Sequence, residues 1–172
     1  MTESQKIFLN ALNCIPGVGS ETLKKIEEYF GGDFKSAFES SESQLTAAGV
    51  ENKELAAIAG NKKRINPEKE WSRLEKEKVK MIVHDETEFP ELLKRIHSSP
   101  VLLYVRGELK KEDDFSFGIV GTRLATGYGK ETTQTIAFKL ASVGLTIVSG
   151  MAWGIDTEAH KGALSAKGRT IA

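Results

Sequence analysis

The chain of 172 residues offers little for redox or metal chemistry, since it contains one cysteine and three histidines. A single cysteine, Cys14, cannot form a disulfide within the chain, and no His/Cys cluster has the spacing of zinc ligands. We therefore expect no metal site. We also expect Cys14, beside Ile15, to be a buried packing residue.

Long apolar segments are also missing. Runs such as Val101 to Val105 fall far short of the roughly 18 residues that a membrane span needs. The N-terminus lacks the basic-then-apolar pattern of a signal peptide. With 40% hydrophobic and 28% charged residues, the sequence predicts a cytoplasmic, globular chain of one or two domains that makes no membrane contact.

The common nucleotide-binding fingerprints are absent as well. No G-x-G-x-x-G directly follows the apolar segment at residues 115–120, and no G-K-[ST] of a P-loop occurs. We accordingly expect no cofactor. His160 and Asp156 have helical spacing, but no serine, cysteine or second carboxylate completes a catalytic set, so we expect packing and capping roles, no catalytic residues and no enzymatic activity.

A net charge is lacking too, because 24 basic residues balance 24 acidic ones. The balance is uneven, however. From Gly121 to the C-terminus six basic side chains face three acidic ones, so that this stretch has a net charge of plus three. The asymmetry weakly favours an anionic ligand in the C-terminal half.

The sequence pattern of residues 1–64 predicts several short amphipathic helices. One of them has Ser20 as its expected N-cap and ends at the Gly31-Gly32 pair. We predict a small all-helical domain of the helix-hairpin-helix or SAM-like type, followed by an exposed linker helix at 65–78.

Residues 79–172 alternate strands and helices. Strands are expected at 79–83, 101–105, 115–120, 145–148 and 169–172, with helices at 91–96, 127–143 and 155–166. The later part of this pattern predicts an α/β fold, in which right-handed crossovers join parallel strands and helices cover both faces of the sheet. Because the last strand has only begun at Ala172, we expect this to be a truncated Rossmann-like domain, lacking the rest of its sheet.

Two glycine-containing loops, 121–129 and 149–156, follow consecutive strands of this sheet. Ligands of open parallel sheets bind beyond the carboxyl ends of the strands, so we expect the two loops to face each other across one cleft. Small residues, hydroxyls, backbone N–H groups and the guanidinium of Arg123 are the components of an anion site. On spacing alone, tight turns are an equally good interpretation.

The loops resemble a known family. The segment GIVGTR at 118–123, followed by Tyr128-Gly129, and the segment SGMAWGIDTEAH at 149–160 are similar to the two hallmarks of the DprA/Smf (DNA-processing protein A) family. The second matches the family pattern S-G-x-A-x-G-I-D-x-x-A-H. The resemblance covers Val79 to Ala172.

The resemblance implies a binder of single-stranded DNA that protects incoming DNA and assists loading of the RecA recombinase during natural transformation. It also implies a homodimer for the full-length protein. Arg123 is expected to pair with a phosphate. By position, the phosphate cleft comprises Gly121, Thr122, Arg123, Ser149, Gly150, Met151, Ala152 and Gly154.

Other interpretations stay open. The segment around Gly17 and Gly19 resembles a DNA-binding hairpin, and with Lys161 it forms a possible secondary DNA site. Packing or protein docking is the alternative there, favoured by the charge of minus one of residues 1–64.

A nucleotide-hydrolysing enzyme of the related lysine-decarboxylase-like Rossmann group is an alternative function, although its G-G-x-G-T-x-x-E loop is absent. A protein-interaction scaffold is a third. Trp153 either stacks on a base or is an ordinary exposed or packed indole.

Overall fold

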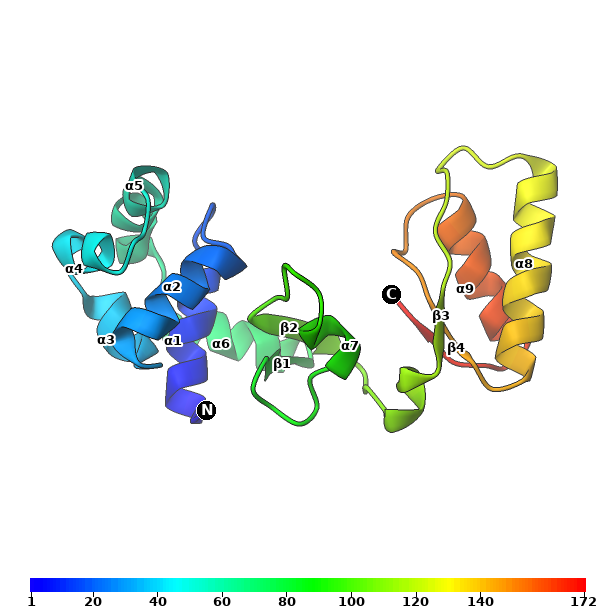
Figure 1. The fold of residues 1–172 in the computed structure, drawn as a ribbon, viewed down its shortest axis with the longest axis horizontal. Coiled ribbons are helices and arrows are strands. Elements are labelled where there is room, and N and C mark those ends of the chain that lie inside the picture. Colours follow the sequence, from blue (N-terminus) through cyan, green and yellow to red (C-terminus); the bar gives the residue numbers. More distant parts are fainter. The chain divides into compact units, whose positions relative to one another are not determined.

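The computed structural model describes all residues, 1–172, and the chain divides into two compact units, Met1–Glu108 and Leu109–Ala172 (Figure 1). None of the helices has the length and apolar character needed to cross a membrane.

Helices make up most of the first unit. They are α1 (Glu3–Asn13), α2 (Ser20–Phe30), α3 (Phe34–Glu39), α4 (Glu42–Ala47), α5 (Asn52–Asn61), the short 3₁₀ helix η1 (Lys62–Arg64) and α6 (Pro67–Lys76). The all-helical character expected for residues 1–64 is confirmed. The expected cap is wrong by one residue, because Gly19 is the N-cap of α2 and Ser20 is already helical. The predicted end of α2 is confirmed, with Gly31 in the left-handed conformation.

The expectation that Cys14 is buried is wrong. The buried stripe of α1 continues from Leu9 and Leu12 to Ile15. Cys14 follows the end of the helix, one residue off this stripe, and is exposed. A neighbour in sequence does not share the burial of Ile15, because adjacent residues at a helix end point in different directions.

Two strands of the first unit form an antiparallel pair. They are β1 (Val79–Val83) and β2 (Leu102–Arg106), with the short helix α7 (Glu91–Lys94) in the connection between them. Met81, Val83 and Leu102 belong to the same buried core as the helices. The Tyr104 hydroxyl donates to Asn10 Oδ1 over 2.6 Å, which ties β2 to α1. This pair is therefore separate from the parallel sheet.

Helix α6 falls where a linker helix was expected, yet it packs against α1 and β1. Its partly buried Trp71 and Leu74 contact the core of the first unit. The structural boundary lies between Glu108 and Leu109, after the antiparallel pair, and so differs from the predicted limits of 64 and 79. The difference arises because these two apolar side chains give α6 a buried stripe despite its many charges.

The second unit is an α/β layer. It contains the 3₁₀ helix η2 (Lys111–Asp114), β3 (Ser116–Gly118), α8 (Gly127–Ser142), β4 (Thr146–Val148), α9 (Ile155–Ser165) and β5 (Thr170–Ile171). The strands form one sheet in the order β3-β4-β5, with both pairs parallel. The predicted α/β class and parallel sheet are confirmed.

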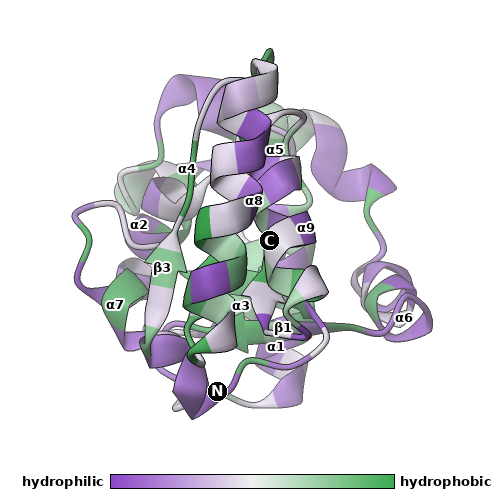
Figure 2. Cartoon of the chain, turned by 90° about the vertical axis from the view of Figure 1, so that its right-hand side faces the viewer, coloured by the Kyte–Doolittle hydropathy of each residue, from purple (hydrophilic) through white to green (hydrophobic).

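Both long helices of this unit lie on one face of its sheet (Figure 1). They pack closely against each other, and their shared core is built from small side chains around one strand residue, namely Ala137, Ala141, Ile147, Ala159 and Ala163. The expectation that helices cover both faces is wrong for these residues. Because the strand order advances in one direction, two right-handed crossovers must place both helices on the same side. Figure 2, which faces α8, shows hydrophobic positions among hydrophilic ones along that helix.

Candidate nucleic-acid interface

Two loops leave the same edge of the parallel sheet. The loop at 119–126 follows β3, and the loop at 149–154 follows β4. The N–H of Ile119 donates to the Val148 carbonyl over 2.9 Å, which extends the pairing of the two strands to the start of the loops. The sheet thus brings together the two segments that the sequence singled out, at the carboxyl ends of their strands.

The loops touch each other directly. Gly154 has a φ of +84°, and a Cβ on it would lie 2.3 Å from the Thr122 carbonyl oxygen. A Cβ on Gly121 would lie 2.6 Å from Cγ1 of Ile155. The N–H of Ile155 donates to the Thr122 carbonyl over 3.2 Å. The two loops therefore pack against each other at these positions, because two glycines without side chains let the backbones approach closely. We call the joint surface of the two loops the ridge.

Asp156 holds the second loop in shape. Its side chain is buried, and Oδ2 accepts from the N–H of Ala152 over 3.4 Å. The Ala152 carbonyl accepts from both the N–H and the hydroxyl of Thr157, over 3.1 and 2.7 Å. Gly154 is the N-cap of α9, so Asp156 lies within the first turn and fixes the preceding loop instead of capping the helix.

Ser149 positions the loop from beneath. It is buried, its hydroxyl donates to the Ile119 carbonyl over 2.7 Å, and its N–H donates to Ile171 over 3.0 Å. Both of its donors are used inside the sheet. Gly121, Thr122, Arg123, Gly150 and Met151 are exposed, whereas Ala152 and Gly154 are partly buried.

The ridge carries donors that have no acceptor within the chain. The N–H groups of the four residues 120–123 make no hydrogen bond, and the same holds for those of Gly150, Met151, Trp153 and Gly154. Groups of free N–H donors at the end of a parallel sheet attract anions. The ridge therefore has the donors of a phosphate site.

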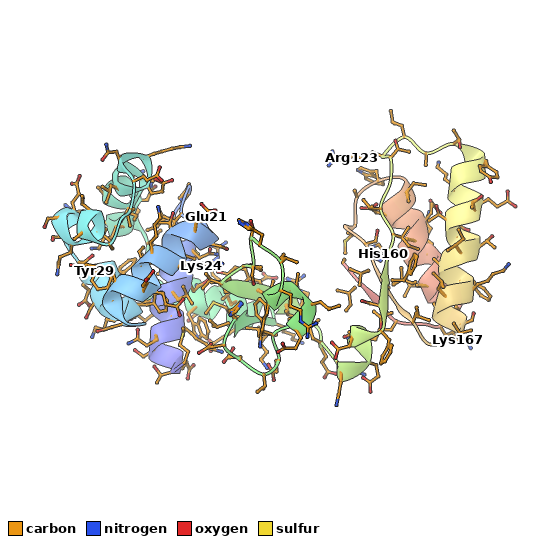
Figure 3. The ribbon with its side chains drawn as sticks, viewed as in Figure 1. Glu21, Lys24, Tyr29, Arg123, His160 and Lys167 are labelled. Atoms are coloured by element: carbon orange, nitrogen blue, oxygen red, sulfur yellow. The ribbon has the colours of Figure 1, made fainter.

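Arg123 adds a full positive charge to these donors. Its side chain is exposed, forms no salt bridge or hydrogen bond, and points away from α8 (Figure 3). The start of α8 lies on the same loop, and Thr126 caps it by accepting from the N–H of Gly129 over 3.2 Å. Sequence reasoning assigned no role to Thr126, although a threonine directly before a glycine-rich helix start is a recognisable N-cap signal.

The positive charge of Lys161 is offset by a neighbouring carboxylate. It shares the lining of a pocket of about 330 Å³ with Met151, His160 and Leu164. Its Nζ lies 3.0 Å from Oε1 of Glu158. A hydrogen bond from Gln134 and the ion pair with Lys161 hold the pKa of Glu158 below its usual range, so this carboxylate stays charged and offsets the lysine.

His160 is engaged with the sheet. Its Nδ1 lies 2.7 Å from the Thr170 hydroxyl, which itself donates to the Ile147 carbonyl over 2.8 Å. It forms no hydrogen bond with Asp156, so the expected packing role matches its contacts. No three His, Cys, Asp or Glu side chains of the chain are grouped so as to hold a metal ion.

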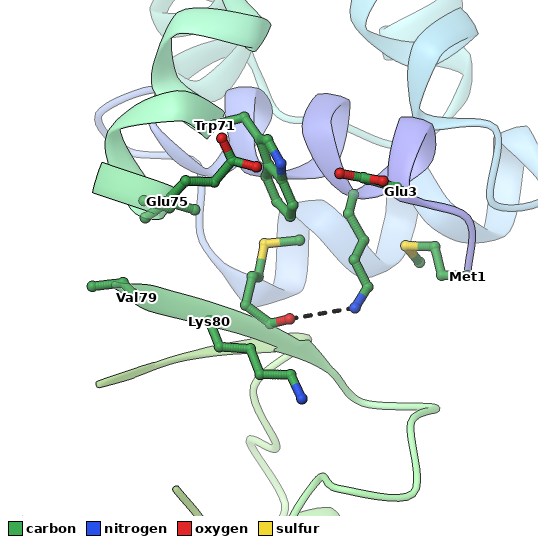
Figure 4. A pocket seen from close by; sticks show the side chains of 9 residues that line it. Met1, Glu3, Trp71, Glu75, Val79 and Lys80 are labelled. Carbon is green, nitrogen blue, oxygen red and sulfur yellow. Dashed lines mark hydrogen bonds between the residues drawn. The ribbon is translucent and has the colours of Figure 1, made fainter. Parts of the chain in front are cut away.

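The remaining predicted residues, Gly17 and Gly19, belong to the first unit, whereas the ridge belongs to the second. Gly17 has a φ of +90° in the turn between α1 and α2. The first unit also contains a pocket of about 390 Å³ beside Trp71 and Glu75, where Lys6 donates to the Met81 carbonyl over 3.3 Å (Figure 4). No predicted site residue lines that pocket.

Comparison with known proteins gives a consistent family. The family model described as DNA recombination-mediator protein A matches residues 80–172. "Protein Smf" of Synechocystis sp. is 32% identical over 177 residues, which cover 100% of this chain and 44% of that protein. "DNA processing protein DprA" of Bacillus subtilis is 39% identical over 85 residues, 49% of this chain and 29% of that protein.

A solved structure resembles the chain as well. The crystal structure of DNA processing protein A from Streptococcus pneumoniae has a TM-score of 0.70 and 27% identity, and the match covers 94% of this chain and 54% of that one. The chain thus spans about half the length, or less, of these relatives.

Proposed function

Because this chain belongs to the DNA recombination-mediator protein A family, we propose that it binds single-stranded DNA on the ridge formed by the loops at 119–126 and 149–154. The observation that carries the proposal is the combination of free N–H donors with the unpaired Arg123 at the carboxyl ends of β3 and β4. A guanidinium binds a phosphate through two parallel hydrogen bonds, and backbone N–H groups add donors of fixed direction.

The family also supports a proposal for the biological role. The terms "recombination-mediator" and "DNA processing" in the names of the family and its relatives support a role in which the full protein protects incoming single strands in the cytoplasm. We further propose that it delivers them to the RecA recombinase during natural transformation, acting as a homodimer and without catalysis. Lys161, Gly17 and Gly19 remain secondary contacts in this proposal.

A salt-dependent titration tests the proposal. Fluorescently labelled single-stranded and double-stranded oligonucleotides of equal length are titrated with the chain at several salt concentrations. We expect tighter binding of the single strand at every salt concentration, with an affinity that falls as salt rises because phosphate contacts release counterions. Equal affinity for the duplex would refute the proposal. Magnesium-dependent hydrolysis of ATP above background would instead favour a nucleotide-hydrolysing enzyme.

A further inference from the structure

Five large apolar side chains are exposed on the ridge and in the first turn of α8 beside it. They are Val120, Leu124, Tyr128, Met151 and Trp153, which we call the loop cluster. Scattered apolar side chains are common on protein surfaces, but a concentration of them around one polar site marks a binding surface. The loop cluster lies on the same two loops and the first turn of α8 as the free donors and Arg123, so a ligand bound there meets both polar and apolar groups.

The backbone on both sides of Trp153 is held by other parts of the second unit. The residue before it, Ala152, is fixed at both its N–H and its carbonyl by the side chains and backbone of α9. The residue after it, Gly154, is locked against the Thr122 carbonyl. The residue itself is 81% exposed. An aromatic side chain on a fixed backbone loses little conformational entropy when a ligand covers it.

In an inference that rests on the proposed function, we propose that Trp153 stacks on a nucleobase of the same strand whose phosphate Arg123 binds. A Cβ on Gly154 would lie 2.7 Å from the Arg123 carbonyl oxygen, so the two residues belong to segments in direct contact. A nucleotide offers a flat apolar face joined to an anionic phosphate, which matches both halves of this surface. A purely apolar partner would leave the guanidinium and the N–H donors without an acceptor. Stacking on the indole tolerates any base, so the contact is independent of sequence.

Oligonucleotides with and without bases test this inference. Single-stranded oligothymidylate and an abasic oligomer of the same length share a phosphate backbone and differ in the bases. We expect Trp153→Ala to weaken binding of oligothymidylate on the order of 5- to 150-fold and binding of the abasic oligomer by less than about twofold. Trp153→Phe retains an aromatic face and should preserve most of the affinity.

Phe115→Ala is the matched control, because Phe115 is also aromatic and 78% exposed but precedes β3, at the opposite edge of the sheet. It should change neither affinity, and thermal melts should show every variant folded. An equal loss on both oligomers, or no loss on either, would overturn the stacking while leaving phosphate binding intact. Wild-type protein that binds neither oligomer would refute the proposed function, and the stacking with it. A change in sedimentation of Trp153→Ala alone would assign the loop cluster to a second copy of the chain and also overturn the inference.

Discussion

Gly154 is the residue at which the two loops meet. Its φ of +84° lies in the region that favours glycine, and a Cβ there would overlap the backbone of Thr122 and Arg123. We expect Gly154→Ala to lower the free energy of unfolding of the second unit by at least about 2 kcal/mol and to weaken single-strand binding, because the Arg123 loop must move. Calorimetry and the oligonucleotide titration measure the two effects.

Gly127→Ala is the control for that change. Gly127 is the first residue of α8, has no positive φ, and a Cβ on it would meet nothing within 4 Å. We expect this variant to be as stable as the wild type or more stable by up to about 1 kcal/mol. Equal destabilisation by the two substitutions would contradict the role given to Gly154.

Single residues also show what the sequence can and cannot predict. The choice of Arg123 as a candidate phosphate contact could be made from its position directly after a strand. In the structure its side chain is exposed and unpaired, as a phosphate contact requires. The burial of Ser149 and the loop-holding role of Asp156 do not follow from the pattern. Both depend on which backbone groups the fold brings near, whereas the sequence shows only that polar residues occur in a loop.

At the scale of elements, one carboxylate ties the entry segment of the second unit to its strands. Asp113 in η2 accepts from the Thr146 hydroxyl over 2.9 Å and forms an ion pair with Arg169. The hydrogen bond from Arg169, more than any other contact, holds the pKa of Asp113 below its usual range. A lowered pKa means that the charged form stabilises the fold above the ordinary aspartate value of about 3.9, and that this stabilisation is lost as the pH falls through the lowered pKa.

We expect Asp113→Asn to lower the free energy of unfolding at pH 7 by about 1–3 kcal/mol, since it removes the charge that Arg169 pairs with. The gap to the wild type should close as the pH is lowered below about 4. Asp114→Asn, at an exposed neighbour, should have no measurable effect. Urea unfolding from pH 7 to pH 3 checks both, and a gap that does not change with pH would show that the ion pair contributes nothing.

The order of elements was predictable, whereas their arrangement was only partly so. The alternation of apolar segments located β3, β4, β5 and the helices between them. It did not reveal that β1 and β2 form an antiparallel pair of their own, because short apolar strands look alike in either kind of sheet. The apolar pattern also did not reveal that both helices cover one face of the sheet. That arrangement depends on the order of the strands in the sheet, which the pattern does not contain.

At the scale of the whole molecule, the chain is two units whose chemistry differs. The first unit has the larger apolar core, and the second has the ridge and the excess of positive charge. Within the second unit, Arg169 and Lys161 are paired with carboxylates, whereas Arg123 is free. Of these three basic side chains only Arg123 lies on the ridge without a carboxylate beside it, so the position of this free guanidinium matters more for DNA binding than the sum of the charges.

The most direct test of the central claim compares Arg123→Ala with Lys139→Ala. Each removes one positive charge from an exposed position, but Lys139 lies in the last turn of α8, remote in sequence from both loops. Titrations with single-stranded DNA across a range of salt should show Arg123→Ala weaker by about 1–3 kcal/mol, with the salt slope reduced by about one, and Lys139→Ala nearly unchanged. Thermal melts must show both variants folded. Equal losses with unchanged salt slopes would mean that the ridge is not the binding site and that charge alone attracts the DNA.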